Sequence, residues 1–322
     1  MKIQANVLVP EQYSGKGEDE REVMGDEMKN FVQKYPQGEI NWGDGFIIAH
    51  GKGVITDSRD PNAEAKAARA AELDAKAHLL EIVNDVPVDD SMRAGEEKKM
   101  SFAMEGFVQG AQIAAQSKSG TTVTVTVQAP IRGVKGMTMT MLGYYTPEPP
   151  PKVAEPPKPQ PPPPASLQAE SYTGVVIDAR KVPANAAVFP KVKDTKKREV
   201  YSVGAVNKDD LAKRGMASYA VVARDVELSR LFPHALVIQV SYMPDDQAAT
   251  KQKRRQGYKP LVVSAADADG KLKANLIISE EDAAKIKAVD EKTGALKQCR
   301  VVVVVSSEVG GLEGLFRPRP SR

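Results

Sequence analysis

Residues 147–164 read PEPPPKVAEPPKPQPPPP, and eleven of these eighteen residues are proline. Proline fixes φ near −65° and has no amide donor, so this run can join neither a helix interior nor a central strand. We expect an extended polyproline II spacer, about 3.1 Å per residue and so about 55 Å when fully stretched. The chain is therefore predicted to form two globular domains, residues 1–146 and 165–322, joined by this proline-rich linker.

Charge is divided unevenly between the two predicted domains. Residues 1–146 carry 16 basic and 21 acidic side chains, whereas residues 165–322 carry 27 and 19. Each domain is long enough to bury a core of its own. An acidic first half and a basic second half suggest contacts between unlike halves, or a basic face for an anionic partner.

The chain shows no sequence signal for a membrane span or for disulfide bonding. No stretch approaches the roughly 20 apolar residues that a membrane helix requires. The first residues, MKIQANVLVPEQYSGKG, lack the apolar core of a signal peptide, although a mature form without its leader would look the same. The single cysteine, Cys299, precedes five valines at 301–305, so we expect a buried thiol and no intramolecular disulfide.

In the first domain we expect a helix packed on a small antiparallel sheet. Residues 45–55 and the alternating segment 121–131 have the pattern of strands, and a glycine turn near 117–121 pairs the second with the segment before it. Residues 20–35 are predicted to form a short amphipathic helix. A longer helix is expected over 61–86, with a buried face formed by Ala63, Ala67, Ala70, Leu73, Ala77 and Leu80.

The second domain is also predicted to be α+β, with more strands. The expected strands are 172–182, 198–206, 235–243, 260–268 and 275–279. A short helix is expected at 209–214, with helical turns over 215–232, and Ser279 followed by Asp282 indicates the start of another helix. The run Val301–Val305 is apolar throughout, so we expect it in the middle of a sheet that is covered on both faces.

Motifs for catalysis or metal binding fail on their spacing. The segment Gly45–Gly53 resembles a phosphate-binding loop but lacks the hydroxyl residue that should follow Lys52. The histidines His50, His78 and His234 lie in different elements without zinc-site spacing. With a single cysteine and no nucleophile motif, we expect neither an enzyme nor a cofactor or metal site.

One candidate interaction site combines Asp178 and Arg180, which lie two apart near the end of a predicted strand and so face the same side. Glu199 or Tyr201 from the next strand could complete a polar site with them. The alternative is a structural ion pair at a strand end.

Two basic clusters are further candidates, because clustered lysine and arginine can contact phosphate groups. The first is Lys196-Lys197-Arg198, and the second comprises Lys251, Lys253, Arg254 and Arg255. No aromatic residues interleave with them, so an acidic protein surface is a better partner than nucleic acid. The alternative is that both clusters lie in solvated loops.

Two segments resemble known bacterial families. The first runs GDGFIIAHGKGVITDSRDPNAEAKAARAAELDAKAHLLEIVNDVPVD, followed by FVQGAQI and TVTVTVQAPIRG. It resembles the LPP-twenty type lipoproteins and the N-terminal domain of the flagellar outer-ring protein FlgT. Their pattern places an alanine-rich helix, here with Ala70, Asp74, Ala75 and Leu79, between a glycine-containing strand and a hairpin.

The second segment is YTGVVIDARKVPANAAVFPKVKDTKKREVY, followed by GYKPLVVSAADADGKLKANLIISEEDAAKI. It resembles the domain that often follows in the same envelope proteins. Together the two resemblances cover about two-thirds of the chain and imply an exported protein of bacterial envelopes, with relatives in flagellar motor rings. No lipobox cysteine is visible, so the resemblance does not extend to lipidation.

These observations predict a non-catalytic envelope scaffold or assembly protein, periplasmic or outer-membrane-associated and with flagellar association as one implication. Its expected partners are proteins, further copies of itself, or cell-wall or flagellar components, without a transmembrane segment. The alternative is a periplasmic module that binds a ligand or the cell wall through Asp178, Arg180 and Tyr201.

Overall fold

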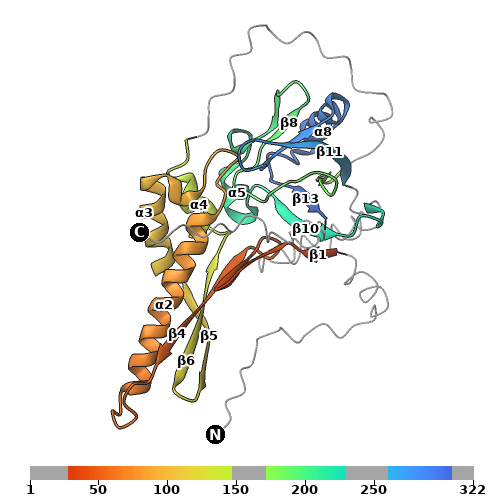
Figure 1. The fold of residues 1–322 in the computed structure, drawn as a ribbon. Helices are drawn as coiled ribbons and strands as arrows, with labels where there is room; N and C mark the ends of the chain where they lie inside the picture. The colour runs from red at the N-terminus through yellow and green to blue at the C-terminus, as the bar shows by residue number, and fades with distance from the viewer. Residues whose placement is uncertain (1–27, 147–171, 229–259, 307–322) are drawn as a thin grey trace, which may run out of the picture.

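The computed structural model describes residues 28–146, 172–228 and 260–306. They form one five-stranded and one eight-stranded sheet with helices, so the predicted α+β class with two sheet-based bodies is confirmed (Figure 1). We call the five-stranded sheet and its helices the first body, and the eight-stranded sheet and its helices the second body. The proline-rich linker at 147–164 lies outside the described residues.

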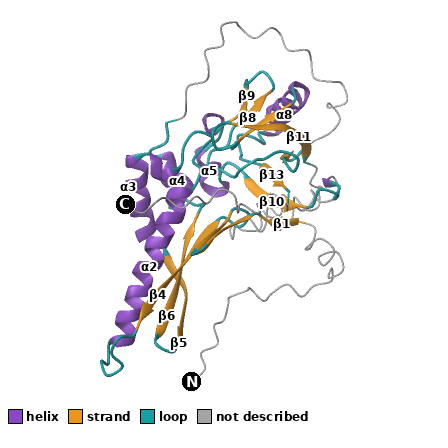
Figure 2. Cartoon of the chain, viewed as in Figure 1, coloured by secondary structure: helices purple, strands orange, loops and turns teal. Residues whose placement is uncertain are grey.

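The first body is an antiparallel sheet with strand order β2-β3-β4-β6-β5. The strand β6 alternates buried valines with half-buried threonines, because only one face of the sheet is covered. The helices α2, α3 and α4 gather on one side of this sheet (Figure 2). The strands are β2 (Val32–Tyr35), β3 (Gly38–Asn41), β4 (Phe46–Val54), β5 (Gln112–Ser119) and β6 (Thr122–Pro130), and the helices are α2 (Ala63–Asp85), α3 (Lys98–Gln109) and α4 (Met137–Leu142).

Close approach of helix α2 to strand β4 depends on small residues. A Cβ atom added at Gly51 would overlap the backbone of Ala71 and Ala75. The alanines of α2 repeat every four residues, which places them on one stripe of the helix surface. Glycine in the strand and alanine in the helix therefore let the two backbones meet.

Two sequence predictions for the first body are wrong in detail. The buried stripe of α2 consists of Ala63, Ala67, Ala71, Ala75, Leu79, Ile82 and Val83, whereas Ala70, Leu73 and Ala77 are exposed. Ala63 and Ala67 are buried as predicted, but the buried stripe then continues to Ala71 and not to Ala70, because alanines occupy several faces of this helix. The helix predicted over 20–35 is also wrong where the structure describes it, since residues 28–30 and 32–35 are strands.

The second body is a mixed sheet with strand order β1-β10-β13-β7-β11-β12-β8-β9. Its strands β10, β13, β7 and β11 are parallel to one another. The strands are β1 (Met28–Asn30), β7 (Val175–Asp178), β8 (Val192–Asp194), β9 (Glu199–Tyr201), β10 (Ser218–Val222), β11 (Leu261–Asp269), β12 (Asn275–Ile278) and β13 (Val301–Val305), with helices α5 (Lys208–Arg214) and α8 (Glu280–Thr293).

The valine strand β13 lies between β10 and β7, and all five of its residues are buried. Val301 and Val303 belong to the main core, whereas Val302 and Val304 pack with Leu228 in a second apolar cluster on the other face. The prediction of a central strand covered on both faces is therefore confirmed. The Ser279 hydroxyl accepts a hydrogen bond from the Asp282 amide at 3.0 Å, which confirms the predicted start of α8.

The helical turns expected over 215–232 are wrong in part, because residues 218–222 form the strand β10. The segment Ser218–Val222 contains tyrosine and two valines, which favour strands. Its parallel pairing with β13 supplies the backbone hydrogen bonds that short-range sequence patterns cannot reveal. The strand expected at 235–243 lies outside the described residues.

The two bodies are in direct contact. The strand β1 comes from the N-terminal side of the first body, yet it pairs with β10 at the edge of the second body's sheet. The amide of Phe189 donates to the carbonyl of Val88 at 2.7 Å, and the rings of Tyr145 and Phe189 stack with centroids 4.7 Å apart. One main hydrophobic core contains residues of both bodies. The two bodies therefore share one core in addition to being joined by the linker.

Candidate functional site

The carboxylate of Asp178 at the end of β7 is held by Arg180. The Arg180 Nη2 atom lies 2.8 Å from Asp178 Oδ2, and its Nη1 atom donates to the carbonyls of Ala223 at 2.6 Å and Val226 at 2.8 Å. Burial disfavours the charge of Asp178, but hydrogen bonds from Arg180 outweigh burial and hold the pKa of this carboxyl below its ordinary value. The pair joins the end of β7 to the loop after β10, which is the geometry of a structural ion pair.

Tyr201 does not join this pair. It lies on β9, four strands from β7 in the sheet order, and only 1% of it is exposed. Its hydroxyl donates to the carbonyl of Met216 at 2.7 Å, and burial raises the pKa of Tyr201 well above its ordinary value. The side chain of Glu199 accepts a hydrogen bond from Ser202 instead of facing Arg180. The expected polar site is therefore not assembled from these residues.

The first basic cluster is neutralised by acidic neighbours. Lys196 pairs with Glu280 at 2.7 Å, and Arg198 pairs with Asp194 at 2.6 Å and with Glu280 at 3.0 Å. Lys197 pairs with Asp269 at 2.8 Å. The cluster thus fastens the loop after β8 to α8 and β11. The second cluster, Lys251, Lys253, Arg254 and Arg255, lies outside the described residues.

The histidines within the described residues have ordinary polar partners. His50 Nδ1 lies 3.0 Å from Thr126 Oγ1, and His78 Nδ1 lies 2.7 Å from the carbonyl oxygen of His50. Across 28–146, 172–228 and 260–306, no group of three histidine, cysteine or acidic side chains is placed to hold a metal ion. His234 lies outside these ranges.

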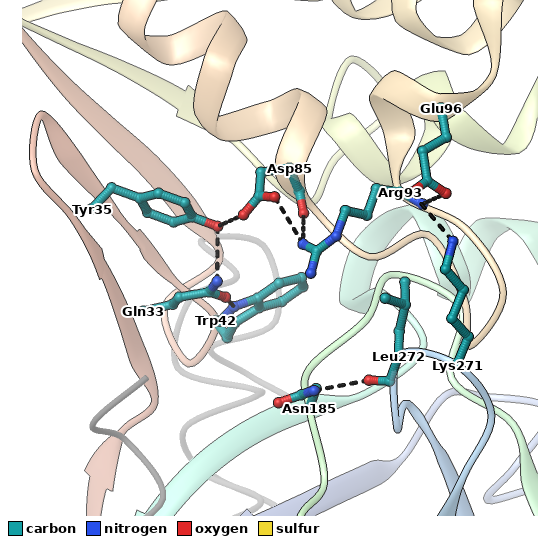
Figure 3. A network of polar contacts seen from close by, with 9 residues as sticks. All are labelled: Gln33, Tyr35, Trp42, Asp85, Arg93, Glu96, Asn185, Lys271 and Leu272. Carbon is teal, nitrogen blue, oxygen red and sulfur yellow. Dashed lines mark hydrogen bonds and ion pairs between the residues drawn. The ribbon is translucent and has the colours of Figure 1, made fainter. Parts of the chain in front are cut away.

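A partly buried chain of polar groups joins the end of α2 to the first strands (Figure 3). Trp42 Nε1 donates to Gln33 Oε1 at 3.2 Å, and Gln33 Nε2 donates to the Tyr35 hydroxyl at 2.8 Å. The Tyr35 hydroxyl donates to Asp85 Oδ2 at 3.2 Å, while Arg93 Nη1 binds Asp85 Oδ1 at 2.9 Å. Burial raises the pKa of both Tyr35 and Asp85.

This polar chain continues toward the second body. The Arg93 amide donates to Glu96 Oε2 at 3.2 Å, and Lys271 Nζ lies 3.5 Å from Glu96 Oε1 (Figure 3). Next to this contact, Asn185 Nδ2 donates to the Leu272 carbonyl at 2.8 Å. These contacts join elements of the two bodies, so we assign these residues a role in stabilising the junction.

An open groove with a volume of about 810 Å³ has a size that suits a ligand or a peptide. It lies between α3, α4 and the start of β5. Three large apolar side chains in it are exposed: Phe102 by 73%, Ile113 by 51% and Tyr144 by 48%. The residues that line it are Gly45, Phe46, Phe102, Ala103, Gly106, Phe107, Gly110, Gln112, Ile113, Ala114, Gln128, Ala129, Pro130, Lys135, Thr140 and Tyr144. We call this surface the α3–β5 groove.

Polar chemistry is sparse in the α3–β5 groove. Lys135 is the one charged residue among those that line it. The groove continues into an edge of β5 that pairs with no strand among the described residues. All eight residues of β5 are exposed, and its other edge pairs with β6. An exposed strand edge presents unpaired amide and carbonyl groups, so it can pair with another chain. This surface could therefore bind the apolar side chains of a partner in the groove and its extended backbone along the edge of β5.

Sequence reasoning missed this groove because it did not predict α3. The segment KKMSFAMEGFVQ carries Met100, Met104 and Val108 at helical spacing, and these three side chains are the buried face of α3. Phe102 lies on another face of the same helix and is left exposed. Two apolar faces on one short helix are the signal that could have indicated both a core contact and a binding surface.

The second body is similar to a known protein family. The family described as the Treponema pallidum Tp0624 second domain matches residues 174–307. The match begins just before β7 and ends just after β13, so it covers the second body except for β1. The chain has no match among curated proteins.

Proposed function

We propose that this chain is a non-catalytic scaffold that binds other proteins or further copies of itself, and that the α3–β5 groove is its contact surface. The observation that carries the proposal is the exposure of Phe102, Ile113 and Tyr144 in the same open groove. Exposed apolar patches bordered by a free strand edge mark protein contacts more often than catalytic sites. Burial of one such side chain by a partner contributes about 1.5–3 kcal/mol.

The alternative proposal, a ligand site at Asp178, Arg180 and Tyr201, has less support. Asp178 and Arg180 bind each other and the loop carbonyls, and Tyr201 is buried elsewhere. The core shared by the two bodies also supports a scaffold role, because a continuous core can hold a binding surface in a fixed position.

The resemblance to LPP-twenty and FlgT-like proteins extends the proposal to the bacterial envelope, where such a scaffold would be periplasmic or outer-membrane-associated. Within the described residues, no helix is long and apolar enough to cross a membrane. The family similarity over 174–307 carries no statement of location, so the envelope assignment depends on the resemblance of the sequence motifs.

Phage-displayed random peptides, selected on the immobilised full-length chain, test the groove directly. We expect enrichment of peptides with alternating apolar side chains, and loss of their binding in the Phe102→Glu variant. Val134→Glu is the matched control, because Val134 is 84% exposed and does not line the groove. Failure to select any peptide whose binding depends on Phe102 would contradict the proposal.

A further inference from the structure

The chemistry of the α3–β5 groove restricts what can fill it. The groove offers aromatic and aliphatic contacts to a partner and a single positive charge at Lys135. A fitting segment therefore carries several apolar side chains and one acidic group, with a backbone that can approach a free strand edge.

The chain's own C-terminal region contains a segment of this composition. Residues 310–316 read GGLEGLF, with Leu312, Leu315 and Phe316 as apolar side chains and Glu313 as the acidic group. Three glycines leave its backbone accessible to a neighbouring strand. Two other apolar runs outside the described residues, 3–9 and 235–243, contain no acidic side chain, and the second of them is attached to the second body at both ends.

The position of Ser306, the last described residue before this segment, favours binding of the segment to the groove of another molecule. The groove residue Gly45 lies against the Arg132 side chain, and Arg132 Nη2 donates to Ser218 Oγ at the start of β10. Since β13 is parallel to β10, with Val302 opposite Ser218, Ser306 lies about 13 Å farther along the strands, away from that contact. The last described residue, Ser306, therefore lies at the end of the strands away from the Arg132 contact and the adjoining part of the groove.

We propose that the α3–β5 groove binds residues 310–316 of a second copy of this chain, with Glu313 beside Lys135. This inference rests on the proposed function, because it names the partner of the same groove. The contact joins the first body of one copy to the tail of the next, so it is heterologous and can be repeated. Sixteen residues follow Ser306, enough to extend about 50 Å and so to reach a neighbouring molecule.

Sedimentation velocity on the full-length chain tests the proposal through complementation. We expect the wild type to associate as its concentration rises. We also expect the groove variant Phe102→Glu and the tail variant Leu315→Asp/Phe316→Asp to remain monomeric when each is alone. A mixture of the two variants should form a heterodimer, because one retains an intact tail and the other an intact groove. The control Ser321→Asp should associate like the wild type.

A charge exchange tests the contact between Glu313 and Lys135. Lys135→Glu should weaken association at least about threefold at low salt, and Lys135→Glu combined with Glu313→Lys should restore it. A merely structural role of Lys135 would not give this rescue.

A Leu315→Asp/Phe316→Asp variant that associates like the wild type would overturn the inference. If association or peptide binding by that variant still depends on Phe102, the proposed function of the groove stands, and only the inference about its partner is wrong. A wild type that stays monomeric at every concentration would also overturn the inference.

Discussion

The sheet of the first body and the sheet of the second body bury their strands in different ways. In the first body, helices cover one face, so β6 alternates buried valine with half-buried threonine, and β5 has a free edge. In the second body, β13 and its neighbours β7 and β10 are covered on both faces, and β13 is valine throughout. A sheet covered on one face retains accessible edges and surfaces for binding, whereas a sheet covered on both faces mainly provides stability.

The largest expected effect is that of a charge in the doubly covered sheet. Val303→Asp would place a carboxylate in the main core, where Val303 is 2% exposed, and should lower the free energy of unfolding by about 4 kcal/mol or more. Urea denaturation followed by circular dichroism measures it. The control Val262→Asp, at a position that is 38% exposed, should cost far less. Equal costs for the two variants would show that the central strands are not covered on both faces.

A smaller loss is expected from crowding the helix that covers the first sheet. Ala71→Leu would force a larger side chain between α2 and the backbone of Gly51, and should cost about 1–3 kcal/mol. Ala70→Leu is the matched control, because Ala70 is exposed on the same turn of α2. A shift of the denaturant midpoint in the Ala70 variant alone would mean that the buried stripe was assigned to the wrong residues.

One aspartate in each body should make the free energy of unfolding depend on pH, and the two dependences should have opposite signs. Arg180 lowers the pKa of Asp178 against the effect of burial, so its contribution to stability is present above about pH 4 and is lost as the pH falls. Burial raises the pKa of Asp85, so its contribution is present below about pH 4 and is lost as the pH rises.

Asp178→Asn should therefore destabilise the protein more at pH 7 than at pH 3. Asp85→Asn should show the reverse dependence, with the smaller loss at pH 7. Urea midpoints measured between pH 3 and pH 7 compare the two variants, and parallel pH profiles would contradict the assignment of opposite shifts.

The smallest effect concerns Cys299, because its test is a labelling reaction that involves no substitution and no change in the free energy of unfolding. Cys299 is fully buried next to the valine strand, and burial raises the pKa of its thiol to about 12. A thiol reagent at pH 8 should label it only after unfolding in denaturant. Rapid labelling of the native chain would place the start of β13 at the surface. It would contradict the conclusion that this strand is covered on both faces.

The elements predicted well from the sequence are those with an unmistakable local pattern. The alternation in 121–131, the valine run and the serine at the start of α8 each depend on neighbours in the sequence, and each is confirmed. The strand β10 and helix α3 were missed because their stability comes from partners distant in the chain. The face of α2 was misplaced because alanine is compatible with several faces of a helix, and only contact with Gly51 and Gly53 selects one.

The sequence by itself determined the α+β class and elements such as β6, β13 and the start of α8, since hydrophobic periodicity and capping act over a few residues. Only the tertiary structure decided that the two bodies share a core, that Asp178 and Arg180 bind each other, and that Phe102 is left exposed in a groove. The physical reason is that burial and pairing across a sheet depend on which distant residues meet. No local pattern carries that information, because the same side chain can face a core or a partner.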